Sequence, residues 1–82
     1  MTTTQQILSD IEFARGSGEF GSIAAVLRYV AAINYEVTLG EFVGACVEAG
    51  FRANTAANRF RESRKLAAEI DAEMALSDLN NA

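Results

Sequence analysis

Apolar residues recur along the chain at spacings of three and four, the pattern of helices that bury one face. The first such segment opens with a candidate capping box, Thr3 with Gln6, and stops near Gly16 and Gly18. The second spans residues 20–33 and is apolar around much of its circumference, which predicts a helix central to the core or to a dimer. Residues 34–37 form a short connector, and no second extended segment is available to pair with it.

The third segment is short and clearly bounded. Thr38 and Glu41 stand in the Thr-x-x-Glu arrangement of a capping box. Gly50 follows the last apolar position and predicts the helix end, because glycine adopts the left-handed conformation without a Cβ penalty. The apolar stripe of this third helix consists of Leu39, Phe42, Val43 and Cys46.

A fourth helix is predicted to start at Ala53 or Asn54, with Arg52 or Asn54 as the cap. At 100° per residue its buried side consists of Ala56, Ala57, Phe60 and Ala67, where Phe60 is expected to pack on Phe42 and Val43. The opposite side holds Asn54, Asn58, Arg61 and Lys65, with Thr55 and Glu62 beside them and Arg59 and Arg64 on the flanks.

The helical pattern continues beyond Lys65, and the chain contains no proline, so one long C-terminal helix is expected. Its apolar edge includes Leu66, Ile70 and Met74. A helix with so few core neighbours is marginal in water, so this edge is expected to pack on a partner subunit or to fold back on the first helix. Residues 77–82 are expected to fray. The whole chain, 1–82, is therefore predicted to be one all-α domain of four helices, with a helix-turn-helix at 38–65.

Charge is distributed unevenly along the chain, whose net charge is −4. Residues 1–51 carry a net −4 and residues 66–82 another −4, whereas residues 52–65 carry +4. Five of the seven basic residues therefore lie within one short segment, and a local basic patch of this kind is what phosphate binding requires. The stretch is also long enough to form most of a helix face.

Several chemistries find no support in the sequence. With no histidine and a single cysteine, Cys46 on an apolar stripe, zinc sites and cysteine–histidine nucleophile pairs are excluded. Gly16, Gly18 and Gly21 match G-x-G-x-x-G, but the preceding residues predict a helix rather than the strand that a dinucleotide site needs. We expect no enzyme activity, no catalytic residues, no cofactor and no metal. No long apolar stretch or leader is present, so a cytoplasmic protein without a membrane partner is expected.

The segment EFVGACVEAGFRANTAANRFRESRK, about a third of the chain, resembles the helix-turn-helix of small phage- and plasmid-type DNA-binding regulators. It departs from their commonest pattern, because the first large apolar residue after the turn is Phe60. The resemblance implies sequence-specific binding of double-stranded DNA by a transcriptional or partition-type regulator. Asparagine and arginine pair with adenine and guanine edges, so base contacts are expected from the stripe Asn54, Asn58, Arg61 and Lys65, with Thr55 beside it. Phosphate contacts are expected from Arg52, Arg59, Arg64 and the region around Thr38.

Two further expectations concern partners. The apolar surface of the 20–33 helix and of the 66–76 segment exceeds what one small core buries, which predicts a homodimer. The alternative to DNA binding is an acidic helical protein-binding module, an adaptor or inhibitor whose basic helix docks on an acidic partner protein. Both functions are compatible with a basic helix flanked by acidic ends.

Overall fold

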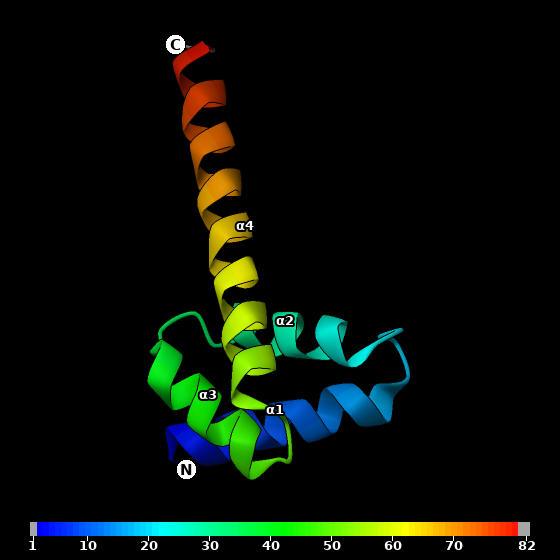
Figure 1. Ribbon diagram of the computed structural model, residues 1–82. Helices are drawn as coiled ribbons and strands as arrows, with labels where there is room; N and C mark the ends of the chain where they lie inside the picture. The colour runs from blue at the N-terminus through cyan, green and yellow to red at the C-terminus, as the bar shows by residue number, and fades with distance from the viewer. Residues whose placement is uncertain (1, 81–82) are drawn as a thin grey trace.

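Four helices follow one another along the chain, and the computed structural model describes the backbone of residues 2–80 and the side chains of residues 2–73. The helices are α1 (Thr3–Ser17), α2 (Ile23–Ile33), α3 (Leu39–Glu48) and α4 (Ala53–Asn80) (Figure 1). No strand occurs within residues 2–80. The predicted all-α, four-helix fold with a long C-terminal helix is confirmed.

The helix starts follow from their capping residues. At α3, the Thr38 hydroxyl accepts from the Glu41 N–H at 3.2 Å and the Glu41 carboxylate accepts from the Thr38 N–H at 2.9 Å, as predicted. At α1 the capping box is formed by Thr2 and Gln5 rather than by Thr3 and Gln6. The run Thr-Thr-Thr-Gln-Gln offers both registers, and the earlier one adds a residue to the helix.

The α2 helix is shorter than predicted, because Ser22 caps it and the chain before it does not join the helix. Phe20 therefore lies outside α2, yet its ring packs against Tyr29 with centroids 4.8 Å apart. A serine at the N-cap position satisfies the Ala25 N–H, which explains why the helix begins after Ser22 rather than at Phe20.

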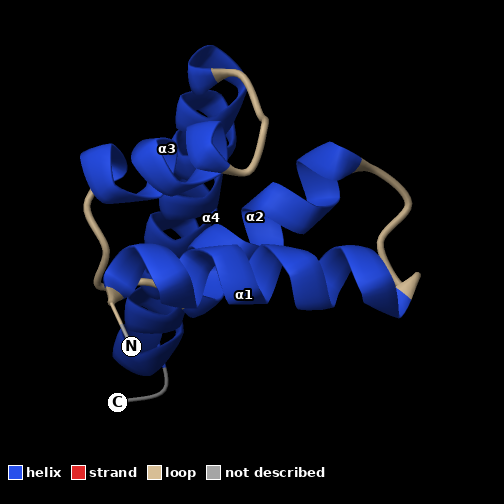
Figure 2. Cartoon of the chain, turned by 90° about the horizontal axis from the view of Figure 1, so that it is seen from below, coloured by secondary structure: helices blue, strands red, loops and turns tan. Residues whose placement is uncertain are grey.

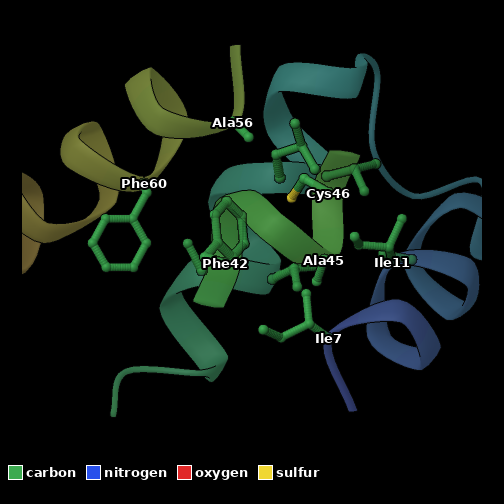
Figure 3. Packing of buried hydrophobic residues seen from close by; sticks show 12 residues of the cluster. Ile7, Ile11, Phe42, Ala45, Cys46, Ala56 and Phe60 are labelled. Atoms are coloured by element: carbon green, nitrogen blue, oxygen red, sulfur yellow. The ribbon is translucent and has the colours of Figure 1, made fainter. Parts of the chain in front are cut away.

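The core lies where α2 and α3 each pack on both α1 and α4. Viewed from below, α1 runs across the body with α2 and α3 beside it (Figure 2). Phe42 and Cys46 of α3 are fully buried among residues of α1 and α4 (Figure 3). The predicted packing of Phe60 on Phe42 is confirmed, since the two ring centroids lie 5.5 Å apart, whereas packing of Phe60 on Val43 stays a prediction. The buried apolar set is Ile7, Ile11, Ala14, Val26, Leu27, Val30, Ala31, Phe42, Ala45, Cys46, Ala56 and Phe60.

The α4 helix packs on the body only over its first part and then projects from it (Figure 1). Ala56, Phe60 and Ser63 are buried, whereas Ala67, predicted to be buried, is exposed because α4 has left the body by that turn. The helix does not fold back along α1 (Figure 1). Residues 77–80 are helical and residues 81–82 lie outside the described chain, so fraying at 77–82 stays a prediction.

Candidate nucleic-acid interface

The turn between α3 and α4 has a defined geometry that fixes where α4 begins. Gly50 has φ +100°, the left-handed region that favours glycine. The Phe51 N–H donates to the Cys46 carbonyl at 2.9 Å and the Gly50 N–H donates to the Val47 carbonyl at 3.0 Å. These two bonds form a Schellman motif, which satisfies the carbonyls at the end of α3.

The helix α4 then begins at Ala53, the earlier of the two starts considered. The Arg52 carbonyl accepts the first bond of the new helix, from the Ala56 N–H at 3.0 Å. Phe51 packs against the core at the same time, so the chain is held on both sides of the turn. The first turn of α4 is therefore positioned rigidly relative to α3.

The first half of α4 exposes a polar stripe, which consists of Asn54, Asn58, Arg61 and Lys65. These residues stand at i, i+4, i+7 and i+11 on the side of the helix that faces away from Ala56 and Phe60. Arg52, also exposed, precedes the stripe at the start of the helix. The structure thus brings four of the nine predicted contact residues, two with amide and two with cationic side chains, to one exposed side of α4, and Arg52 lies exposed just before the helix.

Beside the polar stripe, Glu62 lies between two arginines. Its carboxylate pairs with Arg59 at 2.8 Å and with Arg28 of α2 at 3.2 Å. The Arg59 Nε atom is buried and has no hydrogen-bond partner among the described residues. Arg59 and Thr55 are both only half-exposed. This cluster adds one net positive charge next to the stripe, and Arg28 joins it from 34 positions away, where no sequence signal reveals it.

Arg64 has a different role from the one predicted. Its guanidinium donates to the Ala31 carbonyl at 2.8 Å and to the Asn34 carbonyl at 3.0 Å, and it lies 4.2 Å from the Phe60 ring centroid. Those carbonyls close the C-terminus of α2, where a cation also meets the negative end of the helix dipole. Burial lowers the pKa of Arg64. Because its donors are engaged within the chain, Arg64 is a poor candidate for a phosphate contact.

Thr38 also departs from its expected role. Its hydroxyl and its N–H are both used in the capping box with Glu41. The hydrogen bonds from Thr38 lower the pKa of the Glu41 carboxyl, so a stable negative charge occupies this helix N-terminus. A phosphate would be repelled there, and the α3 N-terminus does not contribute to the candidate interface.

The described part of the chain holds neither a cluster of metal ligands nor a membrane-spanning helix. Among those residues no group of three or more histidine, cysteine, aspartate or glutamate side chains gathers to hold a metal ion. None of the described helices is long and apolar enough to span a membrane. Cys46, the one cysteine, is buried in the core, and this burial raises the pKa of its thiol to about 11.

No protein-family model, no curated protein and no solved structure matches this chain. The functional argument therefore depends on the polar stripe and its surroundings.

Proposed function

We propose that the protein binds double-stranded DNA sequence-specifically by placing the polar stripe of α4 in the major groove. The observation that carries this proposal is the exposed set of two asparagines, an arginine and a lysine on one side of the helix that follows the α3–α4 turn. A major groove admits one α-helix, and its base edges are read by side chains of this kind.

Each residue of the stripe has a role that suits its chemistry. Asn54 and Asn58 are suited to bidentate pairing with adenine, and Arg61 with guanine. Arg52 and Lys65 lie at the two ends of the exposed surface, where they would meet the DNA backbone. The α3–α4 turn fixes the position of these residues relative to α3, because hydrogen bonds within the turn determine where α4 begins.

Local charge supports DNA binding although the net charge is −4. Salt screens charges beyond about 8 Å at physiological ionic strength, so an acidic residue opposes phosphate binding mainly where it lies close to the stripe. Counterion release from DNA depends on the cations that reach the phosphates, not on the total charge of the protein. We therefore expect binding that weakens steeply as salt increases.

The proposal is tested with duplexes selected by the wild-type protein from random sequence. Asn58→Ala should cost about 1–3 kcal/mol on the selected duplex and little on a scrambled one. Arg52→Ala should weaken binding to both and reduce the salt slope by about one. The matched control is Ser9→Asp on the exposed side of α1, which shifts the net charge as Arg52→Ala does but away from the stripe.

Two results would contradict the proposal. One is the absence of any selected duplex at low salt. The other is an Arg52→Ala variant that binds DNA like the Ser9→Asp control. If Arg61→Ala abolished binding to an acidic protein and left DNA affinity unchanged, the protein-docking alternative would replace this proposal. Under the proposal the protein acts in the cytoplasm as a small transcriptional or phage- or plasmid-type regulator.

A further inference from the structure

An apolar groove runs between α2 and the part of α4 that leaves the body. Its volume is about 370 Å³. Leu66 is 57% exposed, Ile70 47% and Tyr29 39%, which is high for large apolar side chains. Residues that line the groove include Arg28, Tyr29, Ala32, Leu66, Ala67 and Ile70. Contiguous apolar surface of this kind marks an interaction site.

The groove continues the buried side of α4 in helical phase. Ala56, Phe60 and Ser63 are buried against α2 and α3, and Leu66 and Ile70 follow on nearly the same side of the helix. At 3.6 residues per turn, Leu66 and Ile70 lie roughly 130° around the helix from the polar stripe. A partner in the groove therefore leaves the stripe free.

The charges around the groove indicate what occupies it. The end nearer the body carries Arg28 and Arg64 in its lining. The projecting segment of α4, residues 66–73, holds Glu69, Asp71 and Glu73 and no basic residue. One end of the groove is thus basic, and the helix that extends from the other end is acidic. A surface with one basic and one acidic region can bind a copy of itself around a two-fold axis, because each region then faces the opposite charge.

We infer that a second copy of this chain occupies the groove, with the projecting segment of its α4 running antiparallel to the first. Leu66 of one copy then lies opposite Ile70 of the other, and the apolar side of each segment is covered. In this register Glu73 of each copy reaches the level of Ser63 on the other, which lines the groove together with Arg28. Residues 66–73 of α4, which no other described residue of the same chain covers, become part of a helix pair.

The spacing of the two polar stripes fits this arrangement, and this one argument rests on the proposed function. Asn58 stands ten positions before the centre of the helix pair, which at 1.5 Å per residue is about 15 Å. The two Asn58 side chains are then about 30 Å apart along the pair. Successive major grooves on one face of DNA are about 34 Å apart. A dimer of this form presents one stripe to each groove.

The test compares two glutamate substitutions by sedimentation equilibrium of the full chain without DNA. Wild type should be a dimer at micromolar concentration. Ile70→Glu, which puts a charge in the groove, should raise the dimer dissociation constant at least about tenfold, since burying an unpaired carboxylate in an apolar contact costs more than the roughly 1.4 kcal/mol to which a tenfold change corresponds. Ala68→Glu adds the same charge to the same helix on the opposite, exposed side and should stay dimeric.

A second substitution tests the orientation of the helices. In the antiparallel pair, Glu73→Gln removes an attraction to Arg28 of the other copy and should weaken the dimer by a few-fold. In a parallel pair the two Glu73 side chains would face each other, so the same substitution would strengthen the dimer. A stronger dimer therefore overturns the antiparallel arrangement, and equal effects of Ile70→Glu and Ala68→Glu overturn the groove as the contact.

DNA binding is measured separately on the same variants, so that the two proposals can fail independently. A wild-type protein that stays monomeric up to about 100 µM, well above the micromolar range expected, contradicts the dimer whatever its DNA affinity. A dimer that is disrupted by Ile70→Glu but binds no duplex supports the groove contact and contradicts the proposed function. Thermal melts of each variant, recorded below the dimer dissociation constant, establish that the monomer is folded.

Discussion

The two halves of α4 carry their apolar residues on nearly the same side of the helix, but only the first half packs that side against other helices. In the first half, Ala56 and Phe60 are buried against neighbouring helices, whereas in the second half Leu66 and Ile70, on nearly the same side, are about half-exposed. The first half is basic and the second acidic. Periodicity alone therefore identifies which side of a helix is apolar, but burial depends on whether another element reaches that side.

The largest expected difference between the halves comes from deleting apolar side chains. Phe60→Ala should cost about 3–5 kcal/mol of the free energy of unfolding, because Phe60 packs on Phe42 in the core. Leu66→Ala should cost less than about 1 kcal/mol in the monomer, where its side chain is mostly exposed. Urea unfolding followed by circular dichroism measures both. A Phe60→Ala melt within a few degrees of wild type would contradict the core packing.

A smaller difference is expected between two arginines of the first half. Arg64→Ala should cost about 1–3 kcal/mol, because it leaves the Ala31 and Asn34 carbonyls without their charged donor. Arg61 is exposed, and Arg61→Ala should change stability by less than about 0.5 kcal/mol. The role predicted for Arg64 from the sequence, a phosphate contact on the flank of the helix, gives no reason for such a cost. Equal melting temperatures for the two variants would show that the α2 contact is not maintained in solution.

The smallest effect on stability is expected from Leu66→Cys, which places a thiol in the second half of α4. The buried thiol of Cys46 in the core provides the comparison. Burial raises the pKa of the Cys46 thiol from 9.0 to about 11, so the folded state favours the neutral thiol. Its contribution to stability is complete below pH 9 and is lost as pH rises towards 11. At pH 8 and at a protein concentration below the dimer dissociation constant, Ellman's reagent should not react rapidly with wild type but should label one thiol in Leu66→Cys, where position 66 is exposed in the monomer. Rapid labelling of wild type would place Cys46 outside the core.

Features that depend on adjacent residues were predicted well. The Thr38–Glu41 capping box and the helix end at Gly50 both involve side chains and backbone groups within a few residues of one another. The exposure of Asn54, Asn58 and Arg61 follows from helical periodicity. The α1 capping box shifted by one residue, since the repeated threonines and glutamines satisfy the same pattern in two registers.

Features that depend on distant residues were not predictable from the pattern. Arg64 points to α2 because its acceptors, 33 and 30 positions earlier, lie at the end of that helix. A flanking arginine without such acceptors would face solvent, and nothing in the local sequence distinguishes the two cases. Ser63 is buried and Ala67 exposed for a related reason, because α4 leaves the other helices between these two residues (Figure 1), a point that the local sequence does not mark.

The uninterrupted course of α4 has a consequence for insertions and deletions. Between Phe60 and Leu66 the helix contains no glycine, proline or turn that could absorb a change in length. One added residue would rotate everything beyond it by about 100° and carry Leu66 and Ile70 away from the groove beside α2. Three or four added residues would come close to restoring the original phase, at the expense of moving the projecting end about 5 Å outward. This segment should therefore tolerate changes of residue type far better than changes of length.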